Sequence, residues 1–219
     1  YTRHYLTLAQ VPAEDSARYA DGFGYLFSDG ENLYGFNNLT GSMARLTFSQ
    51  GVMNREEVCT VDLDALRVKG VDYEYLMDLN TTVCANGYIT FVFTDWRMDV
   101  PASTLYSISL ADGTVEKHPL AQPVMYLADA GEDTLLGITY PVADAATGQA
   151  TPAGIVSIRR SDGAITWLRD WPEEQVPAQV AYDRATDTLY YAAPSTLWAM
   201  PALGQPEKAA YTTLTYTDS

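Results

Sequence analysis

One pattern of turns and strands returns four times along this chain, and this repeat restricts the possible folds more than any other feature. In each copy, a turn rich in Asp, Asn and Gly precedes an apolar strand. Four equivalent residues mark the copies: Leu33, Ile89, Leu135 and Leu189. Their spacings of 56, 46 and 54 residues match the length of one four-stranded propeller blade.

The rest of each repeat also has the pattern of β-strands. Apolar and polar residues alternate with a period of two, and turn residues interrupt the alternation roughly every 8 to 12 positions. Residues 105–113 and 155–163 align without a gap, and both end in an Asp-Gly turn. Helical periodicity is nearly absent. We therefore predict an all-β fold, a β-propeller of about four four-stranded antiparallel blades.

The predicted blades cover most of the chain, and their approximate bounds are 19–64, 72–120, 122–170 and 176–216. One such sheet cannot bury both of its faces alone, so the copies must stack face to face to make a core. Four blades are few for a propeller. The chain is therefore either a closed small ring or an arc of a larger propeller, and a β-sandwich is the third alternative.

Two segments carry a resemblance to a known group of propellers. Residues 154–171 combine an apolar strand, a Ser-Asp-Gly turn and the stretch Ala164-Ile165-Thr166-Trp167. With residues 105–113, this segment resembles the repeats of the quinoprotein-like and YVTN-type β-propellers of bacteria, in which a strand ending in Trp follows a turn glycine. The resemblance extends over residues 19–216. It implies a propeller fold and does not imply a quinone.

The charge balance excludes several classes of ligand. The chain has 28 Asp and Glu against 13 Lys and Arg, which gives a formal charge of −15. Nucleic acids and anionic membranes attract proteins through Lys and Arg, so neither is an expected partner. No stretch approaches the ~18 consecutive apolar residues of a membrane helix, and we expect no membrane insertion.

The first residue is Tyr1, with no Met and no leader segment before it, so the chain reads as a processed mature chain or an excised piece. Few Lys residues and many Tyr and Thr residues suggest an extracellular or cell-surface location. Cys59 and Cys84 both lie in apolar, strand-like contexts. They fit either two buried free thiols or one disulfide between neighbouring strands.

Motifs for catalysis and cofactors are scarce. The chain has two histidines and no Gly-x-Ser-x-Gly motif, so the residues needed for a Ser-His-Asp catalytic triad are scarce. Phosphate-binding, dinucleotide-binding, zinc and calcium motifs are absent from the sequence. The acidic residues of the turns are explained by hairpin geometry. We therefore expect no cofactor, no bound metal and no catalytic residue.

The candidate ligand-binding residues come from loops that a propeller gathers on one face, between second and third strands and between blades. Residues 94–103 and 140–154 form two long loops, and a connection between blades follows residue 170. These segments supply aromatic rings with flanking charges, which suit a sugar, a peptide or a protein. The candidate residues are Asp95, Trp96, Arg97, Asp99, Tyr140, Asp144 and Trp171.

These observations favour a non-catalytic extracellular or cell-surface module that binds a protein, peptide or carbohydrate ligand. Two alternatives remain. The chain could be a carbohydrate-active or quinoprotein-like enzyme that uses loop carboxylates such as Asp95 with Asp144. It could also be a purely structural surface or adhesin segment, in which Trp96 and Trp171 cap the ends of the blades.

Overall fold

The computed structural model describes residues 22–68, 81–97, 101–143, 150–171, 179–193, 196–201, 203 and 212–214. These residues form four four-stranded antiparallel sheets, numbered 1 to 4 in chain order. Sheet 1 contains β1 (Tyr25–Ser28), β2 (Leu33–Phe36), β3 (Ser42–Ser49) and β4 (Val52–Thr60). Sheet 2 contains β5 (Thr82–Ala85), β6 (Tyr88–Asp95), β7 (Ala102–Ser109) and β8 (Val115–Leu120).

Sheets 3 and 4 complete the series. Sheet 3 contains β9 (Val124–Gly131), β10 (Thr134–Thr139), β13 (Gly154–Arg159) and β14 (Ile165–Asp170). Sheet 4 contains β15 (Gln179–Asp183), β16 (Thr188–Ala193), β17 (Thr196–Pro201) and β18 (Thr212–Leu214). A two-stranded ribbon of β11 (Val142–Ala143) and β12 (Ala150–Thr151) extends the connection between β10 and β13. The short helix α2 (Leu63–Leu66) follows β4.

The strands of each sheet follow one another in space as they do in the sequence, so each sheet is a simple meander. This agrees with the turn chemistry, because Asn86-Gly87, Asp112-Gly113 and Asp162-Gly163 all join neighbouring antiparallel strands. The prediction of an all-β fold made of four-stranded antiparallel sheets is confirmed.

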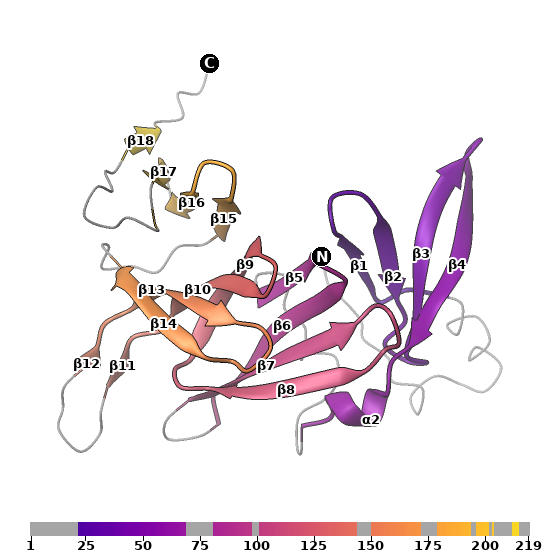
Figure 1. Ribbon diagram of the computed structural model, residues 1–219, viewed down its shortest axis with the longest axis horizontal. Helices are drawn as coiled ribbons and strands as arrows, with labels where there is room; N and C mark the ends of the chain where they lie inside the picture. Colours follow the sequence, from indigo (N-terminus) through magenta and orange to yellow (C-terminus); the bar gives the residue numbers. More distant parts are fainter. Residues whose placement is uncertain are drawn as a thin grey trace.

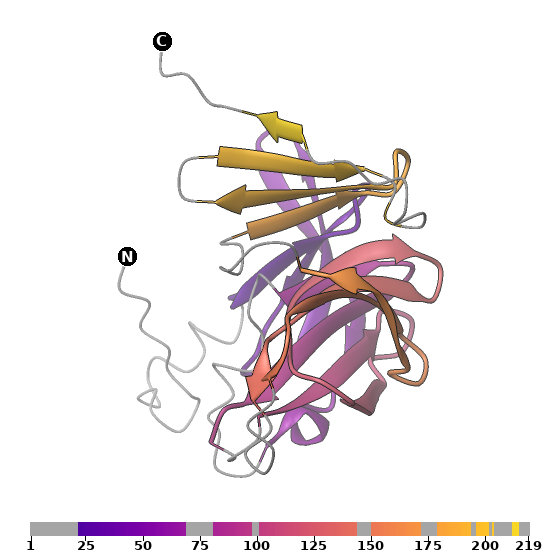
Figure 2. The ribbon, with the colours of Figure 1, turned by 90° about the vertical axis from the view of Figure 1, so that its left-hand side faces the viewer.

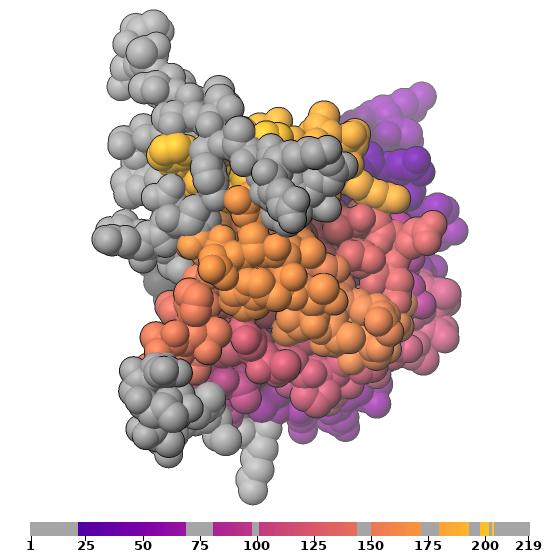
Figure 3. All heavy atoms as spheres, turned by 60° about the vertical axis from the view of Figure 1, so that its left-hand side comes forward, coloured from indigo at the N-terminus to yellow at the C-terminus, as the bar shows by residue number. Residues whose placement is uncertain are grey.

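The four sheets stack face to face in chain order (Figure 1). The first strands of consecutive sheets are in contact: β1 with β5, β5 with β9, and β9 with β15. Figure 2 shows sheet 4, in gold, above sheet 3, in orange. In Figure 3 the atoms of sheet 3 fill the space between sheet 4 and sheet 2. Propeller blades have this arrangement: their first strands lie side by side, and the later strands extend outward.

Each contact between sheets has its own apolar core. Between sheets 1 and 2 the largest buried side chains include Phe36, Met43 and Phe91. Val92 and Leu105, on the other face of sheet 2, pack against sheet 3. Between sheets 3 and 4 the core contains Leu136, Ile138, Ile155, Leu189, Tyr191 and Met200. The alternation of apolar residues thus gives every internal sheet two buried faces.

Turns between third and fourth strands make a second kind of contact between sheets. Gly113 has φ 77°, and a Cβ built on it would lie 2.2 Å from the carbonyl oxygen of Thr60 in sheet 1. Gly163 repeats the arrangement one sheet later, with φ 72° and a Cβ position 2.7 Å from Cβ of His118. Each Asp-Gly turn therefore rests on the last strand of the preceding sheet, where only glycine fits.

Both cysteines are free thiols on adjacent sheets, Cys59 on β4 and Cys84 on β5. Cys59 Sγ donates a hydrogen bond to the carbonyl oxygen of Ser109, at 3.8 Å. Burial raises the pKa of Cys84 to about 12. A thiol with so high a pKa is a poor nucleophile at neutral pH.

The turn after β1 is stabilised by an ionised carboxylate. Asp29 accepts hydrogen bonds from the backbone N–H groups of Glu31 (2.9 Å) and Asn32 (2.7 Å) and from Tyr34 Oη (3.1 Å). Burial by itself raises the pKa of Asp29, but these hydrogen bonds outweigh it and lower the pKa to about 2.

We expect Asp29→Asn to lower the free energy of unfolding in a way that depends on pH. Since the pKa of Asp29 is lower in the folded protein than the ~3.9 of an unfolded chain, ionised Asp29 stabilises the fold above pH ~4 and loses that effect as pH falls toward 2. Urea titrations of wild type and variant from about pH 2.5 to 7 would measure the difference. A difference that stays constant over this range would contradict the prediction.

Candidate functional site

The second strands of sheets 2 and 3 bring two of the predicted loops together. Trp96 directly follows β6, and Tyr140 directly follows β10. Their rings meet edge to face, with centroids 4.5 Å apart and an interplanar angle of 86°. Tyr140 is half-buried, whereas 53% of Trp96 is exposed. An exposed indole that packs against a second aromatic ring can offer a fixed apolar surface for contact with a ligand.

An ion pair joins the two residues that flank Trp96 in the sequence. Arg97 donates to Asp95 through Nε (2.8 Å) and Nη2 (2.7 Å), and its backbone N–H donates to the same carboxylate at 3.0 Å. The side-chain bond to Arg97 is the main reason why the pKa of Asp95 is lowered to about 2. The side chain of Arg97 is 50% exposed and that of Asp95 is 19% exposed.

The pKa of Asp95 also limits what this carboxylate can do in a reaction. A general acid at neutral pH needs a raised pKa, usually obtained by burial away from cations. Asp95 has the opposite environment and remains ionised. It therefore suits hydrogen bonding and electrostatic contact rather than proton donation.

Hydroxyl groups of Thr94 and Ser103 link the strands that lead to the two loops, and no motif in the sequence marks these residues. Thr94 Oγ1 and Ser103 Oγ are 2.6 Å apart across the β6–β7 hairpin. Ser103 Oγ also accepts the backbone N–H of Val124, the first residue of β9, at 3.1 Å. Tyr140 donates its backbone N–H to the carbonyl oxygen of Pro123 at 2.9 Å. The pairing of Thr94 with Ser103 follows from the hairpin register, which is the signal that could have revealed it.

Trp171 lies away from Trp96, in the core between sheets 3 and 4. It follows β14 and donates its backbone N–H to the carbonyl oxygen of Ala153 at 2.8 Å, which continues the ladder of sheet 3. Its ring packs edge to face against Tyr191 of sheet 4, at 4.7 Å, and only 7% of the residue is exposed. Trp171 belongs to the core between sheets 3 and 4, and we do not include it in the candidate site.

Two further candidates, Asp99 and Asp144, lie outside the described residues. The candidate site as described consists of Asp95, Trp96, Arg97 and Tyr140. Within the described ranges, no three His, Cys, Asp or Glu side chains are grouped so that they could hold a metal ion. No helix in the described part of the chain has the length and apolar character needed to cross a membrane.

Comparisons with known proteins give little beyond this geometry. No family model matches the sequence, and no curated protein matches it either. Among solved structures, a candidate 6-phosphogluconolactonase from Bacteroides fragilis is similar, at 10% identity and a TM-score of 0.41. The match covers 88% of this chain and 70% of that one. Similarity at this level carries no argument about ligand or reaction.

Proposed function

We propose that this chain is an arc of a β-propeller that binds a ligand on the face carrying Trp96, without catalysing a reaction. Its four sheets would be four blades, within the bounds predicted from the repeat. The resemblance of residues 154–171 to quinoprotein-like and YVTN-type repeats supports membership of that superfamily. A location outside the cell or at its surface accords with the acidic, lysine-poor composition.

The observation that carries the proposed binding function is the exposed indole of Trp96, supported by Tyr140 from the next sheet and flanked by the Asp95–Arg97 ion pair. Aromatic residues are enriched where proteins bind partners, because one side chain supplies a large apolar contact area. Contributions from two neighbouring sheets also match the way propeller loops converge on one face.

Among the ligand classes considered, a carbohydrate fits this site best. The C–H face of a sugar ring can stack on an exposed indole. Its hydroxyl groups can donate to a carboxylate and accept from a guanidinium, and the ion pair of Asp95 and Arg97 flanks Trp96 in the sequence. The formal charge of −15 disfavours anionic sugars. We therefore take a neutral oligosaccharide as the first ligand class, ahead of a peptide or protein.

We expect Trp96→Ala to weaken oligosaccharide binding by about tenfold or more, because the indole is the main contact surface of the site. The probe is an array of neutral gluco-, xylo-, manno-, galacto- and chito-oligosaccharides, followed by calorimetric titration of the strongest binder. Trp167→Ala is the matched control. Trp167 is also exposed, at 37%, but lies on β14 with its indole N–H bonded to Asp170.

The proposal predicts that the wild type and Trp167→Ala bind the same sugar with affinities that agree within about threefold. This difference is well under the tenfold loss, about 1.4 kcal/mol, that is expected for Trp96→Ala. Equal weakening in both tryptophan variants would show that the site is elsewhere. Failure of the wild type to bind any sugar on the array would overturn the carbohydrate assignment.

A further inference from the structure

Arg160 is a largely buried charged residue at the boundary between sheets 2 and 3. It belongs to the β13–β14 turn of sheet 3, and only 14% of its side chain is exposed. Its guanidinium carbon lies 3.7 Å from the centre of the Tyr88 ring in sheet 2. The guanidinium also pairs with Glu116 of sheet 2, at 3.2 Å, and with Asp133 of sheet 3, at 3.3 Å. We call these three contacts the Arg160 bridge.

The turn that carries Arg160 is itself held in place by Asp133. Arg160 donates its backbone N–H to the carbonyl oxygen of Asp133 at 2.8 Å. Ser161 donates its backbone N–H to the Asp133 carboxylate at 3.1 Å, and its hydroxyl group donates to the same carboxylate. The backbone at residue 160 is therefore fixed, and the guanidinium extends from it across the boundary to sheet 2.

Sheet 2 has a leucine at the equivalent position. Since residues 105–113 and 155–163 align without a gap, Leu110 is the counterpart of Arg160. It makes the same kind of backbone bond to the turn between the first and second strands, from its N–H to the carbonyl oxygen of Gly87 at 2.8 Å. Its side chain is 6% exposed and packs in the core between sheets 1 and 2. An apolar side chain at this position is thus sufficient for two sheets to pack together.

Stability alone does not explain the arginine. Its Nε atom is buried and has no hydrogen-bond partner among the described residues. Burying a guanidinium costs desolvation energy, and apolar replacements for buried ion pairs are often as stable or more stable. The planar fork of an arginine, however, fixes the positions of its partners more narrowly than an apolar contact does. The Arg160 bridge is therefore better suited to setting geometry than to adding stability.

The Arg160 bridge and the candidate ligand site lie at opposite ends of the same two strands. Tyr88 is the first residue of β6, and Trp96 directly follows β6. Asp133 directly precedes β10, and Tyr140 directly follows it. At about 3.3 Å per residue, Tyr88 and Trp96 are about 26 Å apart along the strand. The Arg160 bridge thus joins β6 to β10 at one end, and the aromatic pair joins them at the other.

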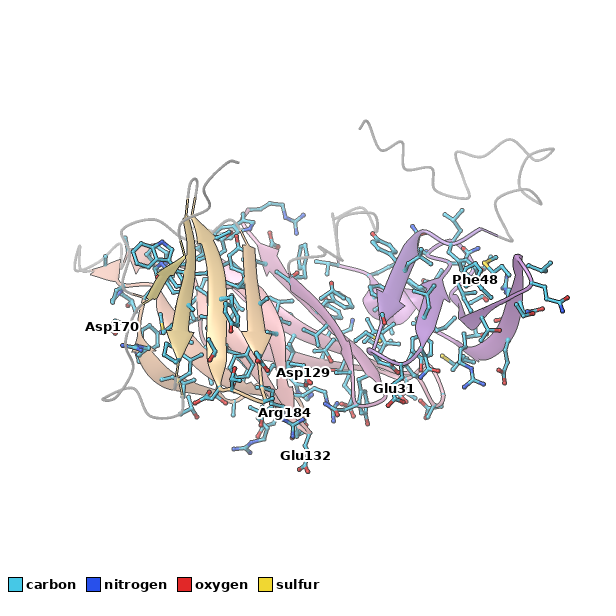
Figure 4. The ribbon with its side chains drawn as sticks, turned by 90° about the horizontal axis from the view of Figure 1, so that it is seen from above. Glu31, Phe48, Asp129, Glu132, Asp170 and Arg184 are labelled. Carbon is cyan, nitrogen blue, oxygen red and sulfur yellow. The ribbon has the colours of Figure 1, made fainter. Side chains whose placement is uncertain are left out.

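Between these ends the two sheets meet through an apolar core. The end with the bridge is the end of the turns between first and second strands. In Figure 4 these turns lie along one edge of the molecule, where labels mark Glu31, Asp129, Glu132 and Arg184. The core between the ends contains Val92 and Leu105 of sheet 2 and Val156 of sheet 3. Apolar contact is not directional, so it restricts the angle between two sheets less than hydrogen-bonded ion pairs do.

We propose that Arg160 is a positioning residue for the ligand site: the Arg160 bridge sets the angle between β6 and β10, and this angle sets the contact of Trp96 with Tyr140 at their far ends. Arg160 itself does not touch the ligand. Its effect on ligand affinity rests on the proposed function. Its effect on the position of Trp96 does not, and that position can be measured in the free protein.

The first test is fluorine NMR of the chain labelled with 5-fluorotryptophan. The 4 tryptophans give one resonance each, and Trp96→Phe and Trp171→Phe identify two of them by loss of a signal. Arg160→Ala should shift the Trp96 resonance, because the indole changes its contact with the Tyr140 ring. The Trp171 resonance should stay in place, since Trp171 packs between sheets 3 and 4.

Two further variants make this test specific. Glu116→Gln removes one charge from the Arg160 bridge at a side chain that is 51% exposed, so the fold is preserved. It should shift the Trp96 resonance in the same direction by a smaller amount. Arg159→Ala is the matched control, because Arg159 is 60% exposed and pairs with Asp162 of its own turn. It should keep the Trp96 resonance of the wild type.

These spectra can overturn the proposal in two ways. A Trp96 resonance that stays at its wild-type position in Glu116→Gln, and in Arg160→Ala if that variant folds, would show that the Arg160 bridge does not position the indole. A shift in Arg159→Ala as large as that in Arg160→Ala would show that loss of any charge from this turn is enough.

Calorimetric titration with the neutral oligosaccharide that the wild type binds best then tests the effect on the ligand. We expect Arg160→Ala to weaken binding by about three- to tenfold, the range of remote coupling in proteins, and Arg159→Ala to bind within about twofold of the wild type. Unchanged affinity in Arg160→Ala would overturn its role in ligand binding. If the wild type binds no sugar while the Trp96 resonance shifts only in the bridge variants, the carbohydrate function is wrong and the positioning role of Arg160 stands.

Discussion

Gly113→Ala is expected to lower the free energy of unfolding by about 2–4 kcal/mol, through backbone strain together with overpacking. The residue at 113 has φ 77°, which L side chains disfavour. The added methyl group would also lie 2.2 Å from the carbonyl oxygen of Thr60. Because that oxygen belongs to a backbone, relief requires the turn of sheet 2 and the last strand of sheet 1 to separate.

Gly87→Ala is the control for the conformational part of this loss. Gly87 has φ 80°, but no atom lies within 4 Å of its Cβ position. This variant should lose only the cost of the left-handed backbone, about 1–2 kcal/mol. Urea denaturation monitored by circular dichroism gives both values. Equal losses in the two variants would mean that the contact between Gly113 and Thr60 contributes nothing to stability.

Trp171→Ala should cost about 3–5 kcal/mol, the usual range for removing a large buried aromatic side chain. Its ring fills the core between sheets 3 and 4 against Tyr191, and the cavity would open on both sheets at once. The same substitution at Trp96 should cost about 1 kcal/mol or less. That indole is 53% exposed and makes an edge contact with Tyr140.

Thermal and urea unfolding of the two tryptophan variants would separate their roles. The expected result is a large loss of stability with Trp171→Ala and a loss of sugar binding with Trp96→Ala. If Trp96→Ala unfolds at a much lower urea concentration than the wild type, Trp96 is a structural cap on its blade. The proposed ligand site would then lose its main contact.

Much of the fold could be predicted because its strands are joined by local turns. Asp112-Gly113 and Asp162-Gly163 specify hairpins by their own chemistry, and alternation along the strands specifies which residues are buried. The contacts of these turns with the neighbouring sheet could not be predicted. The contacts of Gly113 with Thr60 and of Gly163 with His118 depend on sheet twist and stacking, which no local pattern encodes.

The candidate site shows the same limit. Trp96 and Trp171 both directly follow an Asp at the end of a strand, so the local sequence does not show which of the two is buried. In the structure, Trp171 continues the ladder of sheet 3 through its backbone bond to Ala153, and its ring packs against Tyr191 of sheet 4. Likewise, the contact between Trp96 and Tyr140 joins loops 44 residues apart and depends on the hydroxyl contacts of Thr94 and Ser103 beneath them.

The meander order of every sheet also has a consequence for how the chain folds during synthesis. Because each strand pairs with the one made just before it, each sheet can form as soon as its roughly 50 residues have left the ribosome. At roughly 5–20 residues per second, the next sheet arrives about 3–10 seconds later. During that interval the apolar face that will pack against the next sheet is exposed to solvent. The nascent chain therefore exposes one apolar sheet face at a time.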